Sequence, residues 1–327
     1  AHNPISVFPV KQLRMSYQKD TKIPGQELQF VQEDNFLLSL KRGDNNKWLY
    51  NEIIDINYLN EFRNHTSVEL GLKHWTQHPA GDLFYNKVDY LDTANRINTL
   101  RTMELGLTLR WAPHEQFYQG KLYRKPLPNK YPIFTISYDL GLKDVLDGQY
   151  DFHRLTASLY KRIYLSQFGY LDATIEGGKI FGTVPYPLLF VHRANQTFSF
   201  QLQSYNLMNF LEFVSDQYYA LHLQYYMNGY LFNRIPLLKE LKWREVMSFK
   251  MLSGRIQQRN DPDYNGELFK FPENSNHTPI TYSLEQKPYM EASVGLYNVL
   301  KFFRIDYVVR LSYLDHPVVS KSGLRFR

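Results

Sequence analysis

Apolar and polar residues alternate with a period of two over most of the chain. The clearest example is residues 102–111, whose apolar face holds Met103, Leu105, Leu107, Leu109 and Trp111. Because successive side chains of a β-strand point to opposite faces of its sheet, this pattern predicts strands with one apolar face. The same alternation recurs at residues 36–40, 54–58, 68–72, 134–142, 155–159, 171–175, 198–202, 219–225, 241–251, 290–296 and 305–313.

The length of these segments separates two all-β architectures. A tilted strand of about ten residues crosses a bilayer, whereas strands of soluble sheets average about five or six residues. The polar faces carry charges of both signs, and aromatic residues lie near strand ends, as in barrels with a wet lumen and interfacial girdles. We therefore predict an all-β fold, an antiparallel transmembrane outer-membrane β-barrel of about 14–16 strands. A soluble β-sandwich is the alternative.

The chain is predicted to form a single β-barrel domain over residues 1–327. Residues 1–30 are poorly patterned, with short strand candidates at 13–18 and 27–32. Residues 255–286 are long and polar, which predicts an extracellular loop, because long loops of such barrels face outside. Counting hairpins from this loop places residues 204–216 on the same side. It places residues 184–192 and the long connection at 82–98 on the periplasmic side.

Residues 180–216 form an irregular insert in this repetitive chain. Gly177, Gly178 and Gly182 allow backbone angles that other residues avoid. Pro185 and Pro187 cannot donate hydrogen bonds to a strand ladder, so strand pairing should lapse there. Two interpretations stay open, a functional element and a long turn between two hairpins.

Composition excludes several classes of protein. The chain has 26 Tyr, 22 Phe and 4 Trp but no Cys, so disulfides and cysteine metal sites do not apply. The net charge of +6 is spread out, with no basic block of the kind that binds nucleic acid. A mean hydropathy of −0.45 and the lack of long apolar runs predict that no helix crosses a membrane.

Candidate chemistry in the sequence is weak. A stretch resembling half of a calcium loop offers the ligands Asp261, Asp263 and Asn265, but Pro272 stands where the closing Glu is needed. The polar strand faces carry charges that are expected to form structural pairs in the lumen, namely Glu104, Arg110, Asp139, Lys143, Arg304 and Asp306. No Ser/His/Asp spacing, phosphate-binding loop or nucleophile elbow occurs. We therefore expect neither an enzyme nor a cofactor.

Three stretches resemble one family: GGKIFGTVPYPLL at residues 177–189, NLMNFLEFVSD at 206–216 and FNRIPLLK at 232–239. The resemblance is to Bacteroidota-type outer-membrane proteins with an N-terminal carboxypeptidase-regulatory-like domain and a C-terminal barrel. That barrel is distantly similar to the surface-antigen superfamily, which includes BamA and TamA. Within the two motifs of the insert, the residues singled out are Gly177, Gly178, Pro185, Tyr186, Pro187, Asn206, Asn209, Glu212 and Asp216. The Val-Arg-Gly-Phe-like loop motif of the superfamily is missing, because Arg193 is followed by Ala194.

The resemblance implies a role in protein assembly or translocation at the outer membrane of a Gram-negative bacterium. Its partners would be outer-membrane lipid and other outer-membrane proteins or an assembly complex. A passive channel, a nutrient-transport barrel and a structural subunit of a larger complex are the competing functions. Because the N-terminal strand candidates and residues 322–327 are short, we predict a weak or incomplete seam between them.

Overall fold

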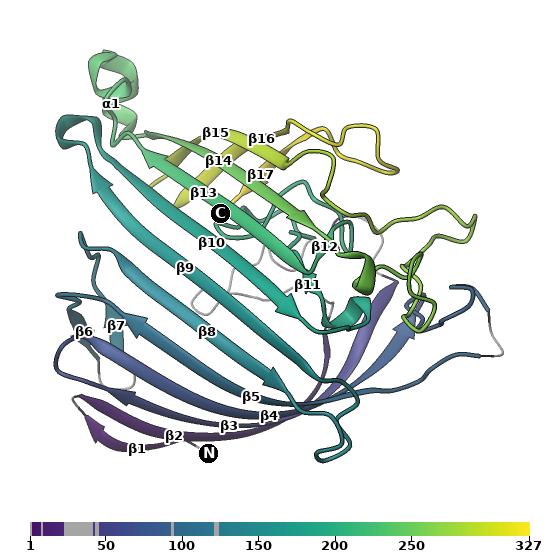
Figure 1. The fold of residues 1–327 in the computed structure, drawn as a ribbon. Helices are drawn as coiled ribbons and strands as arrows, with labels where there is room; N and C mark the ends of the chain where they lie inside the picture. The colour runs from purple at the N-terminus through teal and green to yellow at the C-terminus, as the bar shows by residue number, and fades with distance from the viewer. Residues whose placement is uncertain (1, 8, 23–41, 43–45, 93–94, 121–123) are drawn as a thin grey trace.

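The computed structural model describes residues 2–7, 9–22, 42, 46–92, 95–120 and 124–327. Thirteen strands of this part form one antiparallel sheet in which neighbours in the chain are neighbours in the sheet (Figure 1). They are β1 (His2–Val7), β2 (Val10–Lys22), β3 (Lys47–Glu61), β4 (Thr66–Gly81), β5 (Leu100–Trp111), β8 (Ile133–Gly141), β9 (Phe152–Tyr164), β10 (Tyr170–Phe181), β13 (Gln217–Tyr226), β14 (Arg244–Arg255), β15 (Tyr289–Val299), β16 (Phe303–Arg310) and β17 (Ser322–Phe326). The predicted all-β antiparallel fold is confirmed.

Small elements lie outside this sheet. The pairs β6 (Phe117–Gln119) with β7 (Arg124–Pro126), and β11 (Phe190–Val191) with β12 (Val214–Ser215), form two short ladders. Helical turns occur at α1 (Pro236–Leu241), η2 (Ser166–Phe168), η3 (Tyr186–Leu188), η4 (Phe232–Arg234) and η5 (Gln258–Asn260). No helix in the described part of the chain is long and apolar enough to span a membrane.

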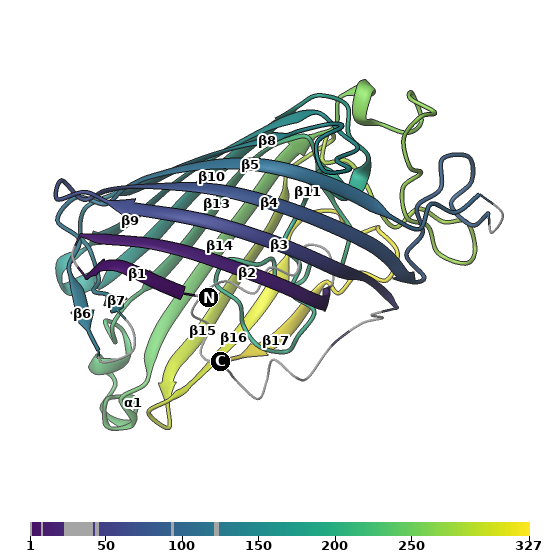
Figure 2. The same ribbon diagram turned by 90° about the horizontal axis from the view of Figure 1, so that it is seen from below.

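Alternation along each strand sorts side chains between the two faces of the curved sheet. On β5 the apolar residues Leu105, Leu107 and Leu109 are exposed on the convex face, while Thr102 and Glu104 are buried on the concave face. The same arrangement holds on β8, where Phe134 and Ile136 are exposed. The sheet curls around an interior that we call the lumen (Figure 2). Buried polar wall residues such as Thr102 and Glu104 lie on this side of the sheet. The described residues therefore leave a broad apolar outer surface uncovered.

The connections divide into two ends. Residues 82–99, 142–151, 182–216, 256–288 and 311–321 leave the strands at one end, the long-loop end (Figure 1). Tight turns such as 62–65, 165–169 and 300–302 lie at the opposite short-turn end, together with 112–132 and the α1 connection at 227–243.

The predicted placement of two connections is wrong. Residues 198–202 do not form a strand of the sheet, so residues 182–216 are one connection between β10 and β13. Removing this strand from the count moves residues 184–192 and 82–98 to the long-loop end, beside 256–288. The predicted strand at 241–251 also starts late, because Leu241 ends α1 and β14 begins at Arg244.

The ends of the sheet are β1 and β17. Within the residues that the structure covers, no ladder joins these two strands. The candidate at 13–18 lies within β2, whereas the candidates at 27–32 and 36–40 lie outside the described residues.

Candidate functional site

The connection 182–216, the luminal insert, lies on the concave side of the sheet (Figures 1 and 2). Gly182, with φ of +111°, turns the chain off β10, and β11 then pairs with β12 to close the base of the insert. Of the three glycines, Gly182 alone uses this backbone freedom, because Gly177 and Gly178 lie in the regular ladder of β10. A Cβ on Gly178 would lie 2.7 Å from the ring of Phe190, so this glycine instead makes room for the insert.

The first part of the insert packs against the long-loop end. Pro185 precedes the helical turn η3, which holds Tyr186 and Pro187, so the ladder lapses here as predicted. Tyr186 is buried and its hydroxyl donates to the carbonyl of Phe84 at 3.1 Å. Together with Val184 and Leu188 it joins an apolar cluster that includes Leu83 and Tyr85 of the 82–99 connection. This cluster fixes the first part of the insert to the 82–99 connection.

Asn206 is the centre of a buried hydrogen-bond network. Its side-chain oxygen accepts from Asn195 Nδ2 at 2.7 Å and from the amide of Gln201 at 3.0 Å. Its backbone N–H donates to Glu291 Oε1 on β15 at 2.8 Å. Its backbone carbonyl accepts from both Nε and Nη2 of Arg325 on β17. Asn206 of the insert therefore connects β15 and β17 of the sheet.

A second attachment is formed by Glu212 and Arg310. Both terminal nitrogens of Arg310 on β16 donate to the Glu212 carboxylate, at 3.0 and 2.6 Å, and both side chains are almost completely buried. His316 Nδ1 lies 3.0 Å from the same carboxylate. Asn209 donates its amide to Glu212 and its Nδ2 to the carbonyl of Val318. Burial would raise the pKa of Glu212, but hydrogen bonds from His316 and Arg310 hold it below its usual value.

Asp216 joins the insert to the 256–288 connection. Its Oδ2 accepts from the amide of Gln257 at 3.0 Å and from Asn260 Nδ2 at 2.9 Å, and Asn260 Oδ1 accepts from the amide of Val184. The start and the end of the insert are thus held by one asparagine of a neighbouring connection. The structure accordingly brings Asn206, Asn209 and Glu212 to β15–β17 and places Asp216 at the rim.

The insert also meets the outer edge of the last strand. Ser199 forms an isolated parallel bridge with Phe326 of β17. The amide of Phe200 donates to the carbonyl of Phe326 at 2.6 Å, and the amide of Phe326 donates to the carbonyl of Phe198 at 3.0 Å. The end of β17 is therefore hydrogen-bonded on one side to β16 and on the other side to the insert.

A Ser–His pair occurs in the insert, between His192 Nε2 and Ser215 Oγ at 2.8 Å. Ser215 has no accessible surface, and burial next to Arg193 lowers the pKa of His192 to about 3. The imidazole is therefore neutral at physiological pH, and a substrate has no path to the hydroxyl. The pair is suited to holding β11 and β12 together.

Below the insert lies a luminal cavity of about 640 Å³, lined by charged wall residues. Arg154 lies 3.7 Å from Glu104, and Arg193 of the insert donates to Glu176 at 2.5 Å. Elsewhere Arg110 pairs with Glu115, and Arg304 with Asp306. The expected structural pairing of Glu104, Arg110, Arg304 and Asp306 is therefore present.

The calcium-loop candidate is occupied by turn hydrogen bonds. Asp261 Oδ1 accepts from the amide of Asp263, and Asn265 Oδ1 accepts from the amide of Glu267. Lys270 Nζ lies 3.6 Å from the Asp263 carboxylate. Among the described residues, no group of three or more His, Cys, Asp or Glu side chains could hold a metal ion.

Sequence reasoning missed Asn195 within the insert and most of the partners of the insert elsewhere, namely Arg42, Lys250, Glu291, Arg310 and Arg325. Lys250 is fully buried on β14 and donates to the carbonyls of Gln201 and Ser204 at 2.7 and 2.5 Å. Arg42 donates to the carbonyls of Asn195 and Met208. The sequence did hold one signal for the partners on strands, which is a charged residue on the polar face of each strand. Such a charge needs a partner when it is buried, but the sequence does not say which residue that partner is.

Fold and site together define a curved antiparallel β-sheet of barrel type with a lumen filled from one end by its own insert. Residues 32–261 match a family model described as "Family of unknown function (DUF5686) C-terminal domain", and the chain belongs to this family. No curated protein matches the chain.

Two solved structures are similar to the chain, and the first of them shows the fold. One is BamA from Haemophilus ducreyi lacking POTRA domains 1–3, with a TM-score of 0.56, 7% identity and coverage of 100% of this chain. The chain spans 61% of that structure's length. The other is CdiB from Acinetobacter baumannii, with a TM-score of 0.44, 11% identity and coverage of 86% of this chain and 42% of that one. At 7% identity the likeness to BamA shows the fold alone, and the surface-antigen superfamily and an upstream carboxypeptidase-regulatory-like domain stay predictions.

Proposed function

We propose that this protein is a β-barrel of the bacterial outer membrane and that its convex face contacts lipid. The support is the uncovered apolar surface, which includes Leu105, Leu107 and Leu109 of β5. A surface of this kind is unfavourable in water and favourable in a bilayer. Cysteine labelling in intact membranes tests the proposal. We expect protection at 105, 107 and 109 from aqueous reagents; fast labelling there, with protection at 104, 106 and 108, contradicts a barrel in lipid.

We further propose a non-enzymatic role in protein assembly or translocation, exerted with other outer-membrane proteins. The observation that carries this role is the outer edge of β17, which in the described residues is bonded only near Phe326, by the insert. Unpaired backbone groups in lipid cost several kcal/mol each, so a free edge favours an added strand. Strand addition gives affinity through main-chain hydrogen bonds. A client strand would therefore pair with residues 322–325 of β17, which the insert leaves free.

Disulfide capture of a defined client tests this role. Leu324 on β17 and Val294 on β15 are both exposed on the convex face, but β15 is paired on both sides. We expect Leu324→Cys to form a disulfide with an unfolded barrel protein that carries one cysteine in its last strand. The control Val294→Cys should not form it. Equal capture by both variants, or no capture by either, contradicts the role.

A passive channel is the competing function, and the cavity below the insert is the observation that favours it. The insert opposes it, because its network with Lys250, Glu291 and Arg325 seals the lumen with buried contacts. Conductance across a planar bilayer separates the two functions. We expect the native protein to conduct poorly and a variant lacking residues 195–212 to conduct well; high conductance of the native protein would favour the channel.

A further inference from the structure

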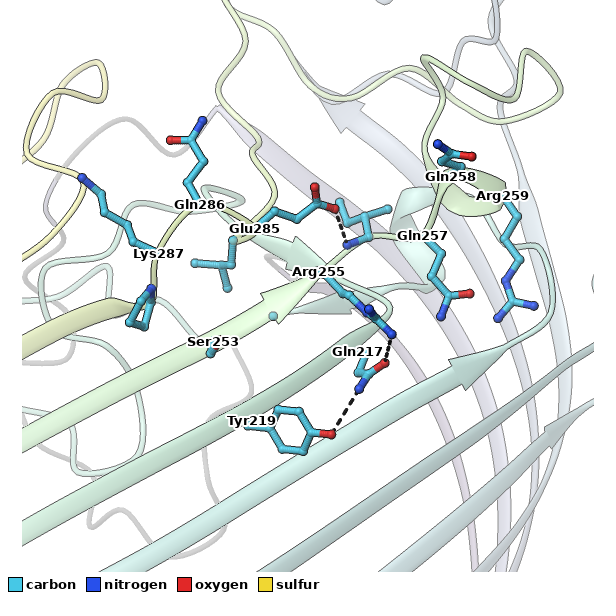
Figure 3. A pocket seen from close by; sticks show the side chains of 14 residues that line it. Gln217, Tyr219, Ser253, Arg255, Gln257, Gln258, Arg259, Glu285, Gln286 and Lys287 are labelled. Atoms are coloured by element: carbon cyan, nitrogen blue, oxygen red, sulfur yellow. Dashed lines mark hydrogen bonds between the residues drawn. The ribbon is translucent and has the colours of Figure 1, made fainter.

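A second cavity lies outside the barrel, at the rim of the long-loop end (Figure 3). This rim pocket has a volume of about 1020 Å³ and is formed by the ends of β13 and β14, η5 and residues 284–288. Its strand residues face away from the lumen. Tyr219 is 60% exposed, whereas its neighbour Ala220 is buried against the insert, and Arg255 is exposed whereas Leu252 is buried.

The floor of the rim pocket is a chain of polar side chains. Arg255 Nη2 donates to Gln217 Oε1 at 3.0 Å, and Gln217 Nε2 donates to the Tyr219 hydroxyl at 3.1 Å (Figure 3). Gln257 and Arg259, from the segment that follows β14, extend to the same side as Arg255 (Figure 3). The two guanidinium groups therefore face one opening, together with neutral amides and a phenol.

The rim pocket has an excess of positive charge. Arg255 and Arg259 form no ion pair with any described residue, and Lys287 lies at the far end, 5.1 Å from the ring of Tyr313. The single carboxylate, Glu285, accepts from the amide of Ile256 at 3.3 Å. Guanidinium groups that are not paired with carboxylates are suited to phosphate, which they bind through two parallel hydrogen bonds.

The surface below the rim pocket is apolar. On the same outer face, β13 continues with Leu221 and Leu223 and β14 continues towards the short-turn end with Met251 and Phe249. Tyr219 stands at the border between these residues and the cations, the position of an interfacial aromatic residue. A ligand that fits both parts has an anionic head and apolar chains.

We propose that the rim pocket binds the phosphorylated head group of a glycolipid in the outer leaflet, with its acyl chains against β13 and β14. This assignment rests on the proposed location in the outer membrane, because the long-loop end is then the extracellular end. Free phosphate shares the head-group chemistry and is the other possible source of the anion.

Native mass spectrometry of the full chain in dodecyl maltoside micelles tests the assignment, with lipid A, phosphatidylcholine and inorganic phosphate as probes. We expect lipid A to be retained at lower concentration than phosphatidylcholine. Arg255→Gln with Arg259→Gln should weaken lipid A binding by about 10- to 30-fold, since each surface cation contributes about a factor of five. Lysine at both positions should restore most of the binding.

The matched control is Arg63→Gln with Lys161→Gln, which removes the same charge from exposed residues near the short-turn end. It should leave lipid A binding unchanged. Equal binding by wild type and the Arg255/Arg259 variant overturns the assignment, as does displacement of lipid A by millimolar phosphate. If the wild-type protein enters liposomes but does not distinguish lipid A from phosphatidylcholine, only this inference fails. If it does not enter liposomes, the proposed membrane location fails with it.

Discussion

Replacing Glu212 with alanine tests whether a buried ion pair holds the luminal insert. In the native protein, Arg310 donates to Glu212 from both terminal nitrogens and His316 contacts the same carboxylate. In the variant, Arg310 keeps the carbonyls of Ser312 and Tyr313 and the ring of Tyr289 as its partners. Its positive charge would then be buried without a counter-charge.

The expected cost follows from this burial. Removal of one member of a buried ion pair costs about 3–5 kcal/mol, because the remaining charge is uncompensated. The Arg310 side chain has no accessible surface, which places the change in this range. A matched control is Glu267→Ala, which breaks a 3.0 Å pair with Lys87 in which the Glu267 side chain is 86% exposed. Exposed pairs are worth about 0–1 kcal/mol.

Hydrogen exchange of the backbone amides, followed by mass spectrometry in detergent micelles, measures the effect. Local opening of the insert should become more frequent in Glu212→Ala, accelerating exchange at residues 206–216 by about two to three and a half orders of magnitude. Exchange in β5 should stay unchanged. Wild-type exchange rates in Glu212→Ala would refute the reasoning, and so would an equal acceleration in Glu267→Ala. Replacing the pair by Glu212→Gln and Arg310→Met should recover part of the protection.

Three further predictions follow from the same structure. Leu107→Arg should reduce the stability of the protein refolded into bilayers by about 2–4 kcal/mol if it lies at mid-bilayer, whereas Thr108→Arg, on the luminal face, should cost less. Gly178→Ala should loosen the insert by about 1–3 kcal/mol, detected as faster proteolysis at residues 184–192, because its Cβ would lie 2.6 Å from the Tyr218 ring; the control Gly177→Ala meets its nearest atom at 3.3 Å. Since the pKa of Glu212 is lowered in the folded protein, its stabilisation is present above the usual value of 4.5 and is lost as pH falls through the folded pKa. Protection of the insert should therefore decrease only below about pH 4.5 in wild type, and Glu212→Gln should not show this decrease.

The strands could be predicted because one constraint acts along each of them. A strand with an apolar outer face and a polar inner face must alternate, and β5 and β8 follow this rule. The same rule failed at residues 198–202. Phe200 is buried beside Leu207 and Val308, so this extended segment alternates because it lies against the inner wall. Alternation therefore indicates only which side of a segment is buried. A strand of the sheet also needs a ladder of backbone hydrogen bonds, and residues 198–202 have one isolated bridge, from Ser199 to Phe326.

The partners of the insert could not be predicted, because they are distant in sequence. Glu212 and Arg310 are 98 residues apart, and Asn206 and Arg325 are 119 residues apart. The curvature of the sheet brings each pair together, and no local pattern specifies which wall charge faces which loop residue. Burial of the insert itself is readable from its own residues, because an exposed loop would not carry apolar side chains such as Leu207 and Phe213.

The contacts of the insert also impose an order on biogenesis. The ribosome makes residues 182–216 before β14–β17, yet the attachments of Asn206 and Glu212 lie on β15, β16 and β17. Until those strands have entered the sheet, the attachments of Asn206 and Glu212 cannot form, and the part of the insert that carries them stays undocked. Seating of the insert therefore reports that β15, β16 and β17 have entered the sheet.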